Sequence, residues 1–144
     1  MKDITIELID DLAVLFVNAF NKEPWNDNWT IEQAKERLTD IINTPKFCGM
    51  ASYEDKKLVG FIMGRGEQYY DGIHFQILEF CVDNKMQGKG LGRKILKEFI
   101  KTLESKGIYK IFLLTLRNEQ TEGFYRKNEL VTDENMCLMY KEWK

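Results

Sequence analysis

Residues 79–94 read EFCVDNKMQGKGLGRK, a mostly apolar run that leads through a turn with three alternating glycines into a helix-like segment. Glycines at such a turn let the backbone approach a ligand closely, and they leave the first N–H groups of the helix without capping side chains. Together with the positive end of the helix dipole, these N–H groups bind a phosphate or pyrophosphate. The segment therefore predicts an anion-binding turn, and five basic residues add positive charge to it: Lys85, Lys89, Arg93, Lys94 and Lys97.

The glycine spacing separates this turn from two common phosphate-binding motifs. The P-loop pattern G-x-x-x-x-G-K-[ST] is absent. In the dinucleotide fingerprint G-x-G-x-x-G, the third glycine would fall on Arg93. The spacing Q-x-x-G-x-G fits, with Gln87, Gly90 and Gly92. At this motif the chain resembles the GNAT family of N-acetyltransferases, in which the motif binds the pyrophosphate of acetyl-coenzyme A.

A second motif, closer to the C-terminus, extends the resemblance. The family pattern N-x-x-A-x-x-L-Y-E-K-x-G-F places a tyrosine seven residues after an asparagine, and Asn118 and Tyr125 stand at that spacing. Phe124 precedes the tyrosine, as an apolar residue does in the pattern. At positions 129–130 Glu-Leu replaces Gly-Phe, so we expect Asn128 to take the left-handed conformation that ends the helix.

The resemblance implies a set of residues that bind acetyl-coenzyme A. In the family the backbone of the strand before the glycine turn pairs with the pantetheine arm, and the Val82 N–H would polarise the thioester carbonyl. Stabilising the charge that develops on that oxygen is a large part of acyl-transfer catalysis. The implied residues are Cys81, Val82, Gln87, Gly88, Lys89, Gly90, Leu91, Gly92, Arg93, Asn118, Phe124 and Tyr125; no metal ion is implied.

Two side chains are candidates for proton transfer. Tyr125 matches the family position that protonates the departing thiolate, although it could instead be an aromatic residue packed in the core. Glu79 is a carboxylate in an otherwise apolar strand, where burial would raise its pKa toward that of a general base. Alternatively, Glu79 faces solvent or pairs with a lysine, and a water molecule is the base.

Aromatic and acidic residues of the N-terminal half are candidates for the acceptor site. Residues 24–29 read PWNDNW and connect two expected helices, which in the family flank the acceptor pocket. The tryptophans could instead pack the helix junction. The candidate substrate-binding residues are Trp25, Asp27, Trp29, Tyr69 and Tyr70. Acidic residues nearby favour a positively charged amine: Glu23, Asp27, Glu67, Asp71 and Glu79.

The resemblance implies an enzyme that transfers the acetyl group of acetyl-coenzyme A to a primary amine, by direct attack in a ternary complex. We expect the acceptor to be a small cationic molecule. One alternative is a protein or peptide acceptor, which a wide, shallow groove would favour. Another is a non-catalytic acyl-coenzyme A sensor, which loss of Gln87, Gly90 or Tyr125 would favour; all three are present. Homodimers are common in the family.

The periodicity of apolar residues predicts an α/β fold of one domain over residues 1–144. We expect the three layers of a GNAT-like fold: a central mixed, mostly antiparallel sheet, a splayed parallel strand pair within it, and flanking helices. The expected strands cover residues 4–8, 47–53, 58–69, 74–82, 109–116 and 135–140. The expected helices cover residues 10–21, 31–43, 90–105 and 120–127.

Composition supports a soluble, cytoplasmic protein. The 144 residues are 44% hydrophobic and 31% charged, and no apolar run is long enough for a membrane helix. Three cysteines without a C-x-x-C spacing argue against a disulfide framework or a zinc site. A net charge of −2 argues against nucleic-acid binding. Residues 85–144 nevertheless hold 13 Lys and Arg against 8 Asp and Glu, which suits an anionic ligand.

Overall fold

The computed structural model describes residues 1–143 and groups them into two compact units, which divide after Leu113. In the first unit five strands form one sheet, in the order β1-β2-β3-β4-β5. The β4–β5 pair is parallel and the other pairs are antiparallel, which confirms the expected mixed sheet. The strands are β1 (Lys2–Asp3), β2 (Phe47–Glu54), β3 (Lys57–Tyr69), β4 (Gly72–Val82) and β5 (Lys110–Phe112).

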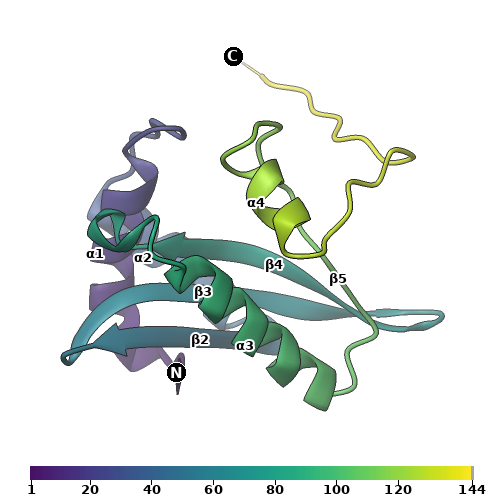
Figure 1. The fold of residues 1–144 in the computed structure, drawn as a ribbon, viewed down its shortest axis with the longest axis horizontal. Helices are drawn as coiled ribbons and strands as arrows, with labels where there is room; N and C mark the ends of the chain where they lie inside the picture. Colours follow the sequence, from purple (N-terminus) through teal and green to yellow (C-terminus); the bar gives the residue numbers. More distant parts are fainter. Residues whose placement is uncertain (144) are drawn as a thin grey trace. The chain divides into compact units, whose positions relative to one another are not determined.

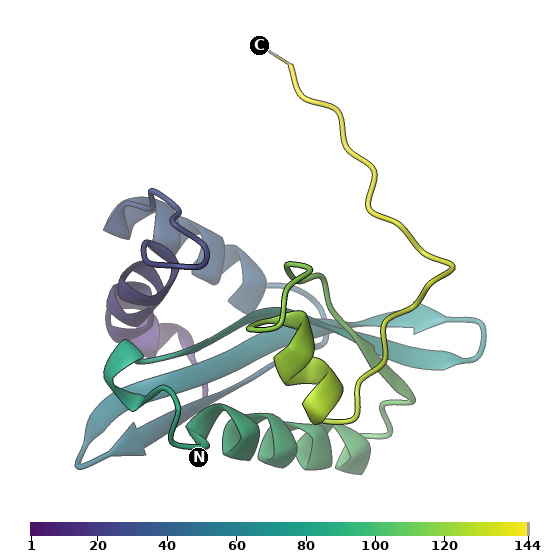
Figure 2. The same cartoon turned by 45° about the horizontal axis from the view of Figure 1, so that its top comes forward.

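Helices cover both faces of this sheet. Helices α1 (Ile9–Phe20) and α2 (Ile31–Ile42) pack on one face, and α3 (Leu91–Ser105) packs on the other (Figures 1 and 2). Thr30 and Gln33 form a capping box that starts α2. Helix α3 buries an apolar stripe, as its spacing predicts: Leu91, Ile95, Leu96, Phe99 and Leu103. The shorter helices are η1 (Ile6–Leu8), η2 (Asn84–Met86) and, in the second unit, α4 (Glu122–Lys127).

Three expected strands differ from those observed. The alternating residues 4–8 end in η1, because the Leu8 N–H bonds to the Thr5 carbonyl and turns the chain into α1. Of residues 109–116, only Lys110–Phe112 pair with β4. Residues 135–140 form no strand, and the described residues 114–143 contain no other strand with which they could form a ladder.

The helix expected over residues 120–127 begins two residues later. The Asn118 side chain accepts a hydrogen bond from the Thr121 N–H (2.8 Å), and this local bond holds the turn that precedes α4. At its other end, Glu129 takes the left-handed conformation (φ 72°), whereas Asn128 was the expected residue. Asn128 stays outside that region and its side chain donates to the Phe124 carbonyl (2.7 Å), which satisfies a group at the helix end.

A bulge in β4 changes which side chains face α1 and α2. Met63 of β3 pairs with Glu79, but the next residue, Gly64, pairs with Ile77, so Leu78 is an extra residue in β4. Gly64 is required beside the bulge, because an added Cβ would lie 1.9 Å from the backbone oxygen of Gln76. The bulge reverses the alternation of side chains along the second half of the strand.

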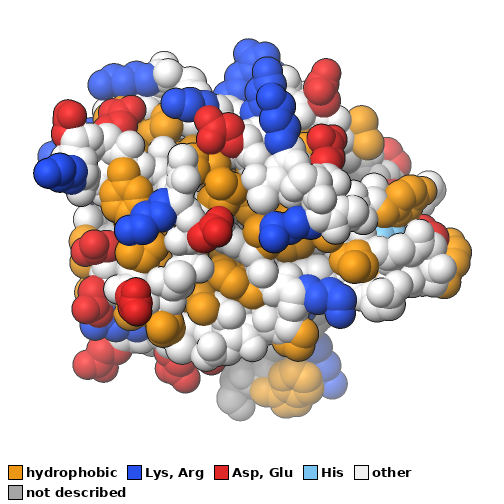
Figure 3. Space-filling model, turned by 90° about the horizontal axis from the view of Figure 1, so that it is seen from below, with side chains coloured by type: hydrophobic (Ala, Val, Ile, Leu, Met, Phe, Trp, Pro, Cys, Tyr) orange, Lys and Arg blue, Asp and Glu red, His pale blue; other side chains and the backbone are white. Residues whose placement is uncertain are grey.

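Each helix in the described chain is too short or too polar to span a lipid bilayer. On the face seen in Figure 3, Lys and Arg side chains are mixed with Asp and Glu side chains.

Candidate functional site

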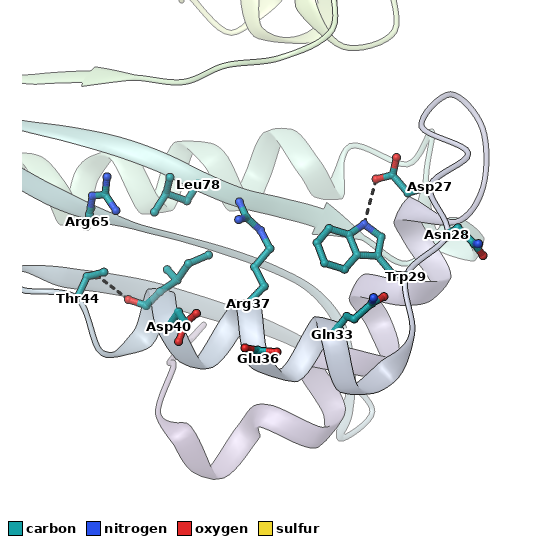
Figure 4. Close-up of a pocket in the computed structure, with 11 residues that line it drawn as sticks. Asp27, Asn28, Trp29, Gln33, Glu36, Arg37, Asp40, Thr44, Arg65 and Leu78 are labelled. Atoms are coloured by element: carbon teal, nitrogen blue, oxygen red, sulfur yellow. Dashed lines mark hydrogen bonds between the residues drawn. The ribbon is translucent and has the colours of Figure 1, made fainter. Parts of the chain in front are cut away.

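A pocket of about 780 Å³ lies in the first unit, beside the bulged part of β4. Its walls come from α2, from β3, and from the α1–α2 loop over residues 21–30 (Figure 4). Leu78, the extra residue of the bulge, also lines it. The pocket contains both apolar and charged side chains, so it can hold a small polar molecule.

Trp29 forms a fixed part of this pocket. The Asn21 side chain donates to the Trp29 carbonyl (3.0 Å) and accepts from the Trp29 N–H (2.8 Å). The indole ring packs edge-on against Phe16 at a centroid distance of 4.9 Å, and its Nε1–H donates to Asp27 (3.0 Å). The structure thus brings two predicted acceptor residues, Asp27 and Trp29, to the pocket wall.

Glu79 follows the pocket-lining Leu78 in β4 and forms an ion pair with Arg37 of α2, which also lines the pocket. Before the bulge, Phe75 packs against Phe99 of α3. After it, Glu79 points toward α2, so the bulge directs this carboxylate to the face of the sheet on which α1 and α2 pack. The Arg37 side chain is 41% exposed and lines the pocket, whereas Glu79 is 8% exposed.

Burial raises the pKa of Glu79 above its ordinary value. The positive charge of Arg37 and its hydrogen bond oppose that rise, and the nearby Asp27 carboxylate adds to it. Loss of water is the larger effect, so the pKa remains raised. A carboxylate with a raised pKa accepts a proton more readily than an exposed one, which suits a general base.

Three other predicted acceptor residues do not line this pocket. Trp25 packs edge-on against Phe20 of α1, with ring centroids 5.4 Å apart. Tyr69 and Tyr70 lie at the β3–β4 turn, where Tyr69 stacks on His74 at 4.1 Å and Tyr70 is fully exposed. Their roles in substrate binding stay predictions.

The glycine turn has the backbone of an anion site. Gly88 and Gly90 both have positive φ (79° and 81°), and a Cβ at either position would meet no atom within 4 Å. Gly90 is the N-cap of α3 and offers no side-chain cap, so the first N–H groups of the helix can bind a ligand. The side chain of Gln87 donates to Asn84 (3.1 Å) and ties the turn to η2. This arrangement and its basic side chains fit a pyrophosphate.

Cys81 and Val82 form the end of β4 that leads to the glycine turn. The β4–β5 ladder ends at Gln76 and Phe112, before this part of β4. Burial raises the pKa of the Cys81 thiol well above its ordinary value, and the Glu79 carboxylate raises it further. Cys81 is therefore a thiol at neutral pH, which agrees with a main-chain role rather than that of a nucleophile.

The remaining predicted residues lie in the second unit, at α4. Asn118 holds the turn before this helix through its bonds to Thr121. Phe124 and Tyr125 are neighbours on α4, with ring centroids 5.1 Å apart. Their roles toward acetyl-coenzyme A stay predictions from the resemblance.

Arg37, Arg65 and Asn21 were not expected at the site. Arg37 does carry a signal, because it stands at helical spacing among the buried residues Ala34, Leu38 and Ile41. A cation in such a stripe indicates a buried partner. Arg65 and Asn21 have no comparable signal in the sequence. Across residues 1–143, His, Cys, Asp and Glu form no group of three that could hold a metal ion.

Comparison with known proteins agrees with the fold. The profile of the acetyltransferase (GNAT) family matches residues 9–129. Among curated proteins, none matches the chain at a significant level. A solved structure described as a possible acetyltransferase from Clostridium difficile 630 superposes with a TM-score of 0.82 at 17% identity, covering 99% of this chain and 97% of that one.

Two further solved structures have named acceptors. An aminoglycoside acetyltransferase from an uncultured soil metagenomic sample, in complex with sisomicin, has a TM-score of 0.76 at 18% identity and covers 99% of this chain and 95% of its own. A ribosomal-protein-alanine N-acetyltransferase from Brucella melitensis biovar Abortus 2308 has a TM-score of 0.75 at 14% identity, with 96% of both chains covered. At these identities the likeness concerns the fold.

Proposed function

Because the chain belongs to the acetyltransferase (GNAT) family, we propose that it transfers the acetyl group of acetyl-coenzyme A to the primary amine of a small molecule. The observation that carries this proposal is the pocket beside β4, with Asp27 and Trp29 in its wall and the buried Glu79 paired with its Arg37. A protonated amine is positively charged, and the carboxylates of Asp27 and Glu79 attract it.

The glycine turn and the end of β4 bind acetyl-coenzyme A in this proposal. The first N–H groups of α3, with Lys89 and Arg93, bind the pyrophosphate. The backbone of Cys81 and Val82 binds the pantetheine arm, and the Val82 N–H stabilises negative charge on the thioester oxygen. The bound molecule supplies an activated acetyl thioester.

Proton transfer accompanies the direct attack of the amine. An ammonium group must lose a proton before its nitrogen can attack, and Glu79 accepts that proton directly or through a water molecule. Arg37 holds the Glu79 carboxylate on the pocket side of β4. Tyr125, by its match to the family motif, gives a proton to the thiolate of coenzyme A as it leaves.

Calorimetric titration with acetyl-coenzyme A, followed by a thiol-release assay over a panel of amines, tests the proposal. We expect binding, and thiol release with one class of small amine. The absence of acetyl-coenzyme A binding would contradict the proposal. Binding without release over the whole panel would instead favour an acyl-coenzyme A sensor.

A peptide acceptor is the second candidate. Trp25 packs against α1 and does not close the pocket, so only Trp29 of the two tryptophans narrows it. Two proteins with a similar fold are an aminoglycoside acetyltransferase and a ribosomal-protein-alanine N-acetyltransferase. The panel therefore includes aminoglycosides and short peptides with a free N-terminus. Release with peptides alone would replace the small acceptor in the proposal.

A further inference from the structure

Two arginine side chains line the acceptor pocket, and each has N–H groups beyond the one used in its ion pair. Arg37 comes from α2 and Arg65 from β3, and their side chains are 41% and 39% exposed. Each uses Nε for its ion pair: Arg37 with Glu79, and Arg65 with Glu67 at 3.2 Å. Within the described chain their terminal Nη groups have no partner. A guanidinium with free Nη groups presents a planar fork that matches the oxygens of a carboxylate.

The charged residues follow an order along β4. Arg65 of β3 pairs with Gln76, which lies in the first half of β4. Glu79 comes later, and after it Cys81 and Val82 lead to the glycine turn. Figure 4 shows Arg65 and Asp27 at opposite ends of the pocket, with Arg37 between them. Asp27 lies close enough to Glu79 to influence its pKa, and the two carboxylates would attract an amine. Glu79 is also closer along β4 than Gln76 to Cys81 and Val82, where the thioester is expected.

Other acidic residues do not cancel the arginine end. Glu36 and Asp40 also line the pocket, but both are exposed residues of α2. In Figure 4 their carboxylates stay beside the helix, whereas Arg37 extends from it toward β4. A long diamine in this pocket would bring its second ammonium group close to a guanidinium, and like charges at short distance repel.

We propose, on the premise of the function proposed above, that the acceptor resembles an amino acid. Its primary amine binds at the end with Asp27 and Glu79, and its carboxylate binds the Nη groups of Arg65, with Arg37 as a second donor. Arg65 thereby determines which amines are acetylated. The pocket selects a molecule with separated positive and negative groups over a polyamine.

L-lysine and cadaverine test this inference, because they differ only in the carboxylate. With saturating acetyl-coenzyme A, we expect kcat/KM for lysine to exceed that for cadaverine by about 10-fold or more, the effect of one charge-assisted hydrogen-bonded pair. Arg65→Gln raises the KM of lysine by about 10-fold and lowers the KM of cadaverine, because it removes the charge that repels the second ammonium group of cadaverine. Arg65→Lys restores part of the preference, because it keeps the charge and loses the fork.

Lys35→Gln is the matched control. It removes a positive charge from α2 at a residue that pairs with Asp10 (2.7 Å) and does not line the pocket. Both acceptors should react as with the unmodified protein. Cadaverine reacting as well as lysine, with no effect of Arg65→Gln, would overturn the inference and leave the proposed function intact.

If neither amine is acetylated, calorimetric titration with hexanoate decides the inference, since hexanoate carries one carboxylate on the carbon chain of lysine and no amine. Binding to the unmodified protein that Arg65→Gln abolishes supports it, and binding that is absent or unaffected by Arg65→Gln overturns it. This titration does not require acetyl-coenzyme A. A failure of acetyl-coenzyme A to bind, which contradicts the proposed function, is therefore a separate result.

Discussion

Arg37 of α2 donates its Nε–H to the carboxylate of Glu79 in β4, 42 residues further along the chain. Two opposite influences act on this carboxylate. Burial raises its pKa, and the guanidinium lowers it by a smaller amount. The pair therefore holds in place a carboxylate that accepts protons more readily than usual, next to the pocket-lining Leu78.

The pH dependence of stability should report the raised pKa of Glu79. Its folded-state pKa lies above the ordinary value of 4.5, so the folded protein binds this proton more tightly than the unfolded chain does. The contribution of the Glu79 proton to the free energy of unfolding is then fully present below pH 4.5, and it is lost as the pH rises through the folded-state pKa. Glu79→Gln cannot titrate, so its stability relative to the unmodified protein should increase between about pH 4 and about pH 7.5.

Urea unfolding of both proteins at the two pH values measures this change. Glu36→Gln, which removes an exposed carboxylate next to Arg37 in the sequence, is the control for a general effect of charge. An equal difference in unfolding free energy between Glu79→Gln and the unmodified protein at both pH values would contradict the raised pKa.

Arg37→Gln should shift the pH profile of acetyl transfer. Without the guanidinium, burial acts unopposed and the pKa of Glu79 rises further. Because the base must be unprotonated, the acidic limb of kcat/KM should move to higher pH. Arg37→Lys should return it toward its original position. A loss of rate that is equal at every pH would mean that Arg37 supports the pocket without influencing the base.

Gly90→Ala should weaken acetyl-coenzyme A binding beyond its effect on stability. An alanine at φ 81° is strained by about 1 kcal/mol, and its Cβ enters the open space in front of the α3 N-terminus. Gly107, near the other end of α3, has a φ of 78° and equally open surroundings, so Gly107→Ala carries the same strain. Both variants should lose similar stability in urea unfolding, while the Kd for acetyl-coenzyme A rises about 10-fold or more only in Gly90→Ala. Equal Kd values for the two variants would mean that the pyrophosphate does not bind at the N-terminus of α3.

Tyr125→Phe should lower turnover without unfolding the protein. Loss of a general acid typically lowers the rate about 100-fold or more, while the aromatic ring keeps its packing. The matched control is Tyr140→Phe, at an exposed tyrosine of the same unit. Thiol-release rates of both variants, with circular dichroism to verify folding, make the comparison. An unchanged rate in Tyr125→Phe would remove its proposed role as the acid.

The sequence predicts most of the fold because its signals are local. The apolar stripe of α3, the capping box of α2 and the alternating strands β2 to β4 depend on residues close together in the chain. The failed prediction over residues 135–140 has the opposite cause. Alternation indicates that a segment can be a strand, but a strand also needs a partner for its ladder, and no local pattern shows whether one exists.

The candidate site is less predictable because its geometry depends on contacts between distant segments. Nothing in residues 77–79 marks Leu78 as a bulge, yet this extra residue decides that Glu79 faces α2. The sequence left open whether Glu79 pairs with a basic residue and suggested a lysine, whereas the partner is Arg37. The glycine turn was predictable, because positive φ and an uncapped helix start are properties of the glycines themselves.

Asn21 should control acceptor binding without touching the acceptor. Its side chain forms two hydrogen bonds with the Trp29 backbone, and it thereby fixes the pocket-lining end of the α1–α2 loop. Asn21→Ala removes both bonds, at a cost of about 1 kcal/mol each, so the loop becomes more mobile. We expect a higher KM for the acceptor and an unchanged Kd for acetyl-coenzyme A. In Asn21→Asp the side chain can still accept from the Trp29 N–H but cannot donate to its carbonyl. The KM of this variant for the acceptor should therefore lie between the KM values of the unmodified protein and of Asn21→Ala. A parallel loss of acetyl-coenzyme A binding would show that Asn21 supports the whole first unit rather than the acceptor pocket.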